Sequence, residues 1–275
     1  MMKVIYRMLV VTLLVLSLCM TGTLAAPTTE VTVVKINSET DEIMSRTTVT
    51  YQWMEENLPV HGDGITRYYH QGPVFDGDKW DPEETTNFKD KGSVKGTDIR
   101  DLCDLVGGAA PGDEIMVRAQ DGYHVEFPYE NVYHPEPRQG PIVLTWYNGA
   151  DPDVGERQGT GYPPDFYSGM RIVFFADTST NTDGLHVYGN DDMKKTMPQS
   201  VHHFYDLYPS TNGFTVKWVD EIRVYSGGYK GEQGLLAKSL QSEPGHDAQQ
   251  SPMSSLIVFI AITGCSILYT RRGMR

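Results

Sequence analysis

Imidazole and carboxylate side chains occur together in one short stretch of the chain. His202 and His203 are followed closely by Asp206, and His186 lies upstream. Imidazole nitrogens and carboxylate oxygens together can bind zinc or iron. The sequence lacks a His-Glu-x-x-His helix motif, and adjacent histidines on a strand would point to opposite faces. We therefore favour packing or surface roles for these histidines over a metal site.

Oxygen-bearing side chains are closely spaced in two polar segments, residues 76–81 and residues 190–192. Aspartate and asparagine oxygens at such spacing are typical of calcium sites. Neither segment has the glutamate at the twelfth position that completes an EF-hand loop. Asx turns, in which these side chains bind nearby backbone N–H groups, account for the same residues and are favoured.

Thiol chemistry is restricted to one position in the polar part of the chain. Cys19 and Cys265 lie in the apolar ends, which leaves Cys103 alone between them. An internal disulfide in that part is therefore excluded. Cys103 shares a helix face with Ile99 and Val106, where a free cysteine is usually a small buried hydrophobe.

The charge balance limits the choice of partners. All 36 acidic residues lie between the two apolar ends, but only 18 of the 23 basic residues do, which gives this part a charge of −18. Such a surface repels a phosphate backbone, so nucleic acid is excluded as a partner. The chain also has no Gly-x-Ser-x-Gly elbow, P-loop or dinucleotide-binding fingerprint.

The two ends predict export and anchoring. Residues 1–26 have the basic start, apolar run and small residues of a signal peptide, cleaved after Ala25 or Ala26. Residues 227–252 read as a flexible stalk, residues 253–271 as a transmembrane anchor, and residues 272–275 as a basic cytoplasmic tail. We expect a single-pass protein of the cell membrane whose large domain is extracytoplasmic. A processed sorting tail is the alternative for the anchor, and it gives the same surface location.

The apolar pattern predicts an α+β fold with mostly strands and a few short helices. A hairpin and a short helix begin the extension at residues 27–95, and residues 61–95 read as a long irregular polar loop. Residues 96–226 form the main domain. Within that domain we expect a helix at residues 98–106 and strands at residues 113–119, 124–128, 142–147, 170–176 and 216–225.

Several ordered segments resemble a known family. They are GTDIRDLCDLVG at residues 96–107, DGYHVEFPYENV at 121–132, the strands at 142–149 and 168–173, and Lys217-Trp218-Val219. In this order they resemble the molybdopterin-binding domain of sulfite-oxidase-type oxidoreductases. Residues 53–59 (WMEENLP) and 68–73 (YYHQGP) are also similar to exported proteins of methanogenic archaea.

The resemblance implies a set of cofactor-binding residues: Tyr123, His124, Arg171 and Lys217. It also implies molybdopterin, or another small anionic ligand, in a cleft formed by residues 68–80, residues 121–127 and Lys217. Residues 68–95, where the family keeps its metal-binding cysteine, contain no thiol. We therefore assign no catalytic and no metal-binding residue.

The sequence thus favours a membrane-anchored ligand-binding module. A molybdopterin-dependent oxidoreductase with atypical metal ligation and a structural protein of the cell envelope are the alternatives. Arg171 and Lys217 could equally be partnered surface groups, and from the sequence we favour that simpler role for them.

Overall fold

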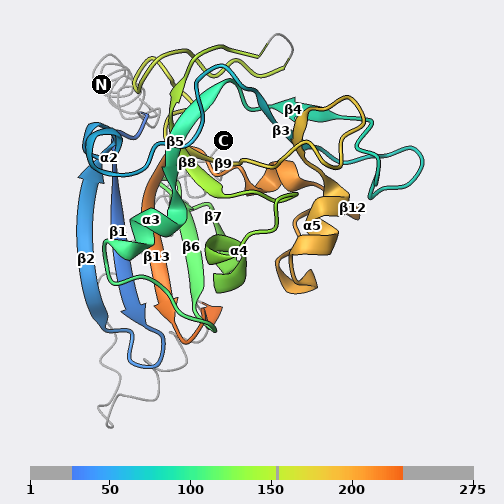
Figure 1. Ribbon diagram of the computed structural model, residues 1–275. Helices are drawn as coiled ribbons and strands as arrows, with labels where there is room; N and C mark the ends of the chain where they lie inside the picture. Colours follow the sequence, from blue (N-terminus) through green and yellow to red (C-terminus); the bar gives the residue numbers. More distant parts are fainter. Residues whose placement is uncertain (1–26, 153–154, 232–275) are drawn as a thin grey trace, which may run out of the picture. The chain divides into compact units, whose positions relative to one another are not determined.

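A five-stranded sheet with the order β2-β1-β13-β6-β7 forms one side of the molecule (Figure 1). The computed structural model describes residues 27–152 and 155–231. The strands of this sheet are β1 (Glu30–Asn37), β2 (Ile43–Thr50), β6 (Glu114–Ala119), β7 (His124–Pro128) and β13 (Val219–Ser226). The α+β class expected from the sequence is confirmed.

Three smaller sheets and several short helices complete the described part. The sheets are β5-β8-β9, from β5 (Val94–Asp98), β8 (Ile142–Asn148) and β9 (Arg171–Phe174); β10-β3-β4, from β10 (His186–Tyr188), β3 (Tyr68–Gln71) and β4 (Phe88–Asp90); and β11-β12, from β11 (Phe204–Tyr205) and β12 (Tyr208–Pro209). The helices are α2 (Tyr51–Asn57), α3 (Ile99–Asp104), α4 (Tyr129–Tyr133), α5 (Asn190–Thr196) and the 3-10 turns η1 (Gln199–Val201) and η2 (Thr211–Phe214).

The N-terminal hairpin is part of the main sheet. β1 pairs antiparallel with β2, as predicted, and its other edge pairs in parallel with β13. The expected boundary between an extension and a domain at residues 95 and 96 falls inside β5, which pairs with β8. Residues 27–229 belong to one compact unit.

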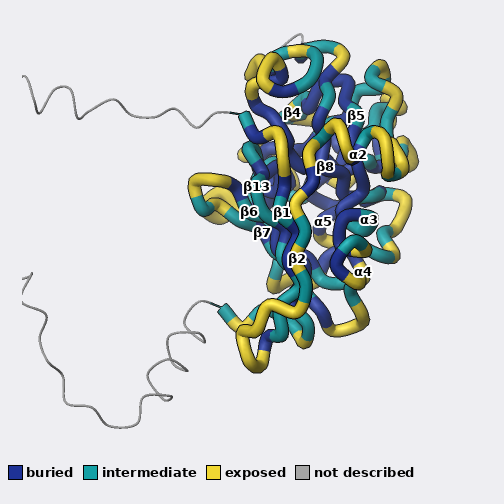
Figure 2. The backbone as a smooth tube through the Cα atoms, turned by 90° about the vertical axis from the view of Figure 1, so that its left-hand side faces the viewer, coloured by how far each residue is buried: buried dark blue, intermediate teal, exposed yellow. Residues whose placement is uncertain are grey.

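The apolar core lies between the main sheet and the β5-β8-β9 sheet. β8 and β9 are buried on both faces, which confirms the sequence prediction, and the dark blue of buried residues marks β8 in Figure 2. Trp146 on β8 is fully buried, and its indole N–H donates to Thr97 Oγ1 at 3.1 Å. α3 begins at Asp98, whose side chain accepts from the backbone N–H of Arg100, and it buries Cys103 completely.

Residues 61–95 are not the irregular loop that the sequence predicted. This segment contains β3, β4 and the start of β5, and it buries polar residues deeply. His70 has no exposed surface: its Nδ1 lies 3.0 Å from the carbonyl oxygen of Thr211, and its Nε2 accepts from the backbone N–H of Phe174 at 3.1 Å. The prediction failed because such hydrogen-bonded polar residues give no apolar pattern in the sequence.

Aspartates of the candidate calcium segments make hydrogen bonds within the protein. Asp78 accepts from the backbone N–H of Trp80 at 3.0 Å. Asp81, nearly buried, accepts from the Gln71 side chain at 2.6 Å and from the backbone N–H of Thr85 at 2.8 Å. These are the Asx-type contacts expected from such residues. Among the described residues, no three His, Cys, Asp or Glu side chains are grouped so that they could hold a metal ion.

Glu84 and Asp192 form a buried pair of carboxyl groups. Glu84 Oε1 accepts from Thr180, while Asp192 accepts from Arg138 Nε at 2.6 Å. A hydrogen bond between two carboxyl groups requires a proton on one of them. Burial, followed by the hydrogen bond and the charge of Asp192, raises the pKa of Glu84 to about 9, so Glu84 carries this proton.

The expected signal peptide at residues 1–26, the anchor at residues 253–271 and the basic tail lie outside the described residues, as does the stalk beyond Gly231. Within residues 27–152 and 155–231, no helix combines the length and the apolar character needed to cross a bilayer.

The proton on Glu84 gives the first testable prediction. In the folded protein Glu84 keeps a proton that the unfolded chain releases above about pH 4.5. The free energy of unfolding should therefore fall as the pH rises from about 4.5 to about 9. Glu84→Gln imitates the protonated carboxyl group, so it should flatten this slope and raise the free energy of unfolding at about pH 8 by on the order of 2 kcal/mol. Urea unfolding at several pH values measures this, with the exposed Glu83→Gln as the matched control. If the free energy of unfolding changed with pH equally in Glu84→Gln and in the unmodified protein, the prediction would be wrong.

Candidate functional site

Three basic side chains lie within electrostatic range of Glu156, which belongs to the segment that joins β8 to β9. Lys91 and Arg171 are almost completely buried, and Lys217 is partly exposed. Each is close enough to act electrostatically on Glu156, and Arg171 and Lys217 both act on Lys91. We call Lys91, Arg171, Lys217 and Glu156 the cation cluster.

Lys91 is placed by a tight turn between β4 and β5. Asp90 accepts from the backbone N–H of Gly92 at 2.7 Å, and the backbone N–H of Lys91 donates to the carbonyl oxygen of Tyr68 at 2.8 Å. Gly92 has a φ of +85°, and a Cβ atom there would collide with the Asn148 side chain. The turn therefore requires glycine, and it directs the Lys91 side chain inward, towards Asn212.

Arg171 begins β9 and lies inside the protein. Its Nη1 donates to Gln158 Oε1 at 2.6 Å, and Gln158 in turn donates to the carbonyl oxygen of Asp90 at 3.1 Å. Its Nε is buried and has no hydrogen-bond partner among the described residues. The favoured interpretation of Arg171 as a partnered surface group is therefore wrong, whereas Lys217 is partly exposed and paired with Glu156. A buried guanidinium N–H without an acceptor is costly, and an anion would satisfy it.

Lys217 pairs with Glu156, and both distances from Nζ to the carboxylate oxygens are 2.6 Å. Although burial opposes it, this contact lowers the pKa of Glu156. Burial, then the charges of Arg171 and Lys217, lowers the pKa of Lys91 well below its ordinary value. Burial also lowers the pKa of Arg171. Positive charge thus exceeds negative charge in the cluster.

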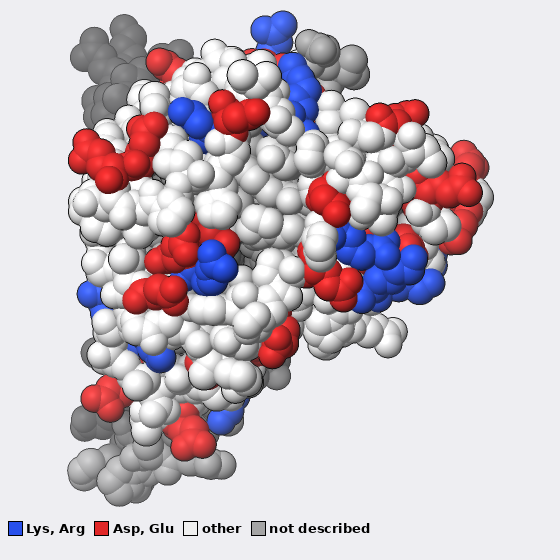
Figure 3. Space-filling view, viewed as in Figure 1, with Lys and Arg blue, Asp and Glu red and all other residues white. Residues whose placement is uncertain are grey.

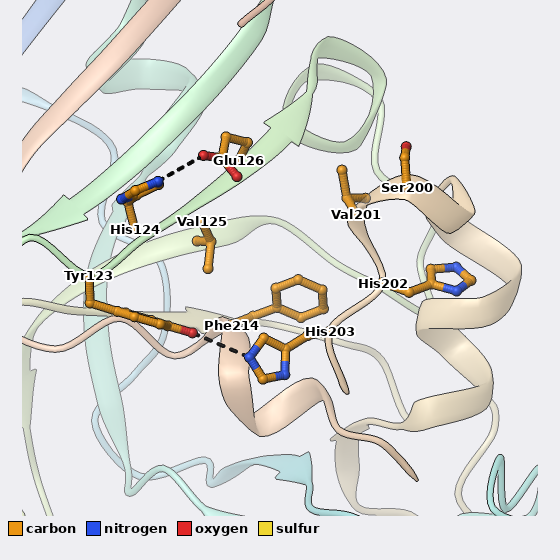
Figure 4. A pocket seen from close by; sticks show the side chains of 9 residues that line it. All are labelled: Tyr123, His124, Val125, Glu126, Ser200, Val201, His202, His203 and Phe214. Atoms are coloured by element: carbon orange, nitrogen blue, oxygen red, sulfur yellow. Dashed lines mark hydrogen bonds and ion pairs between the residues drawn. The ribbon is translucent and has the colours of Figure 1, made fainter. Parts of the chain in front are cut away.

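Tyr123 and His124 line a separate cavity of about 270 Å³ (Figure 4). The Tyr123 hydroxyl donates to the carbonyl oxygen of Gly213 at 2.7 Å and lies 3.4 Å from His203 Nε2. His124 Nε2 is 3.2 Å from Glu126 Oε1. The full lining comprises Tyr123, His124, Val125, Glu126, Ser200, Val201, His202, His203 and Phe214. Residues 68–80, expected in the same cleft, do not line this cavity, and residues 200–203 take their place.

The four residues expected to bind a cofactor are therefore divided between two sites, each of which contacts η2. Asn212 Oδ1 accepts from Lys91 of the cation cluster at 2.5 Å, and the next residue, Gly213, accepts from Tyr123 of the cavity. Gly213 also packs directly against the His203 ring, where a Cβ atom would not fit. η2 thus connects the two sites through adjacent residues.

The other chemically interesting residues have structural roles. Cys103 is fully buried, and burial raises its pKa, so it remains a thiol. His202 Nε2 is 3.0 Å from the carbonyl oxygen of Met197, and His186 Nδ1 is 2.7 Å from that of Ala176.

On the face shown in Figure 3, acidic and basic side chains are interspersed and separated by uncharged surface.

Comparison with models of known protein families and with curated proteins finds no match to this chain. The chemistry of the site must therefore be argued from its own residues. Buried cations with unsatisfied hydrogen-bonding capacity bind anions. The sequence drew attention to Arg171 and Lys217 but missed Lys91, because Lys89-Asp90-Lys91 has the composition of an exposed charged turn.

Lys91 provides the second prediction. Because its pKa is lowered in the folded protein, the folded state binds fewer protons than the unfolded chain, and stability should rise with pH towards about 10.5. Lys91→Met removes the buried amine, so it should raise the free energy of unfolding near neutral pH by about 1–3 kcal/mol and reduce this slope. Chemical unfolding at several pH values measures the stability of Lys91→Met and its slope against pH, and Lys89→Met, a change at an exposed lysine, is the control. A Lys91→Met protein less stable than Lys89→Met at every pH would refute this account of the cluster.

Proposed function

We propose that this protein is an extracytoplasmic binding module, anchored to the membrane, that holds a small anionic ligand at the cation cluster. The observation that supports the proposal is the burial of two basic side chains, Lys91 and Arg171. Glu156, the carboxylate that acts on both, is already engaged by Lys217 and is 69% exposed. Burying charge without full compensation is costly, and a phosphate or carboxylate group would supply the compensation.

The unsatisfied Arg171 Nε is the most specific feature of this site. Nη1 of the same guanidinium is committed to Gln158, and Nε is buried without an acceptor among the described residues. Phosphate and carboxylate oxygens are the preferred partners of a guanidinium fork. The site therefore fits an oxyanion better than a neutral ligand.

The resemblance to molybdopterin-binding domains agrees with an anion-binding role, since molybdopterin carries a phosphate. The cation cluster has the donors for that phosphate, and the neighbouring cavity beside Tyr123 and His124 offers room for another part of a ligand. These residues fit the phosphate of such a cofactor better than they fit its metal. Cys103 is sealed in the core, so a thiolate ligand is not offered. For this reason we favour a binding module over a molybdenum oxidoreductase.

The third prediction concerns anion binding by the full chain. Phosphate at about ten times its dissociation constant should stabilise the folded protein by about 1.4 kcal/mol, seen as a rise in melting temperature. Lys217→Met should weaken phosphate binding about tenfold, because it removes one cation and frees Glu156 to repel the anion. Lys89→Met is the control and should bind as the unmodified protein does. A melting temperature independent of phosphate and sulfate would refute the proposal and favour a structural role.

Elemental analysis distinguishes the binding module from the oxidoreductase. The full chain, purified from a host that makes the pterin cofactor, should contain no stoichiometric molybdenum or tungsten. Stoichiometric metal would reject the binding module in favour of an enzyme with atypical metal ligation.

A further inference from the structure

β2 (Ile43–Thr50) forms one outer edge of the main sheet, at the left of Figure 1. β1 pairs with one side of β2, and no strand of the described part of the chain pairs with its other side. The backbone N–H of Tyr51 donates to the carbonyl oxygen of Thr29 at 3.0 Å, and hydrogen-bonded pairs alternate along an antiparallel ladder. Residues an odd number of positions from Tyr51, among them Thr48 and Arg46, therefore direct their N–H and C=O groups away from β1.

A groove of about 450 Å³ lies beside the same edge, and it is lined by Thr47, Thr48, Val49, Thr50, Trp53 and Leu105. Thr47 and Val49 lie opposite fully buried valines of β1, so both are on the core face of the sheet. Trp53 of α2, which is 38% exposed, and the partly buried Leu105 at the end of α3 supply its apolar surface. A strand added beside β2 would place every second side chain on the side of this groove.

β2 lacks most of the features that protect a sheet edge, which are shortness, proline, lysine and charges on the core face. It is eight residues long and contains neither proline nor lysine, and its one charged residue, Arg46, is on the face away from the groove. β7, the opposite edge of the same sheet, has five residues, carries the His124–Glu126 pair and ends at Pro128. Of the two edges of the main sheet, β2 is therefore the one open to a further strand.

Charge around β2 indicates which strand would fit. β2 contains no acidic residue, but exposed acidic side chains flank it at both ends: Asp41 and Glu42 precede it, and Glu56 follows in α2. In either direction of pairing, a second copy of this chain would place acidic ends beside acidic ends, and such like charges oppose association. A strand with basic residues at both ends would be attracted instead.

We propose that β2 is a docking edge for an extended segment of another protein, whose alternate apolar side chains enter the groove and whose two ends are basic. The segment adds a sixth strand to the main sheet through backbone hydrogen bonds to Arg46 and Thr48. In this mode of recognition the backbone bonds provide affinity and the groove selects side chains. The docking edge shares no residue with the cation cluster, so the inference is independent of the proposed anion binding.

Synthetic peptides test the inference on the full chain. KKTVTVTVKK has valines on one face and basic ends, and it should bind saturably when followed by fluorescence anisotropy. EETVTVTVEE has the opposite charge at its ends and should bind at least about tenfold more weakly at low salt. KKTVPVTVKK lacks one backbone N–H that would face β2, and it should also bind about tenfold more weakly.

Variants of the chain provide matched controls. Thr48→Pro removes a backbone N–H that faces the free edge, where proline is tolerated, and it should weaken binding of KKTVTVTVKK about tenfold. Thr47→Lys puts a charge on the face of the groove, whereas Thr48→Lys puts the same charge on the opposite face. Thr47→Lys should therefore bind the peptide at least about fivefold more weakly than Thr48→Lys. Circular dichroism confirms that each variant folds, and the peptide comparison on the unmodified chain does not depend on them.

Three results would overturn the inference: no saturable binding of KKTVTVTVKK, equal binding of the basic-ended and acid-ended peptides, or equal binding by folded Thr47→Lys and Thr48→Lys. Light scattering of the unmodified chain tests the other occupant. A dimer that dissociates in Thr48→Pro would assign the docking edge to a second copy and refute the basic-ended partner.

Discussion

Burial of the basic side chains of Lys91 and Arg171 is the constraint on which the architecture of the site depends. Taking an ammonium or a guanidinium out of water costs several kcal/mol unless polar groups compensate it. Here the compensation comes from neutral amide and hydroxyl groups, namely Gln158 for the guanidinium and Asn212 with Thr215 for the amine. Each of these groups is fixed by further backbone hydrogen bonds. In the proposed function, the ligand supplies the missing negative charge to a site whose donors and acceptors are already in place.

η2 is the element that makes this arrangement rigid. Thr211 accepts from the backbone N–H of Gln71 at 2.8 Å and donates to the carbonyl oxygen of Tyr188 at 2.7 Å, both in the fully buried interior. The neighbouring Asn212 and Gly213 then serve the cation cluster and the cavity. The two sites thus contact adjacent residues of the same four-residue turn.

Much of the fold could be predicted from the sequence, but the site could be predicted only in part. The hairpin β1–β2, the helix α3 and the buried strands β8 and β9 follow from apolar periodicity, which is a local property. Lys91 could not be recognised, because its burial depends on contacts with Tyr68 and Asn212, far away in the sequence. Tyr123 and Arg171 were placed together by resemblance alone, whereas in the structure Tyr123 lines the cavity and Arg171 belongs to the cation cluster. Long-range pairing, rather than local pattern, decides which polar residues meet.

The position of β13 in the main sheet has a consequence for biogenesis. β13, the last strand of the described residues, lies in the middle of the sheet, between β1 and β6. Until residue 226 has left the ribosome, the sheet consists of two separate hairpins, each too small to be stable alone. The main sheet therefore stays incomplete until β13 has been synthesised. Under the proposed export, an unfolded chain is the form that a narrow secretion channel can thread, and this strand order would delay completion of the sheet.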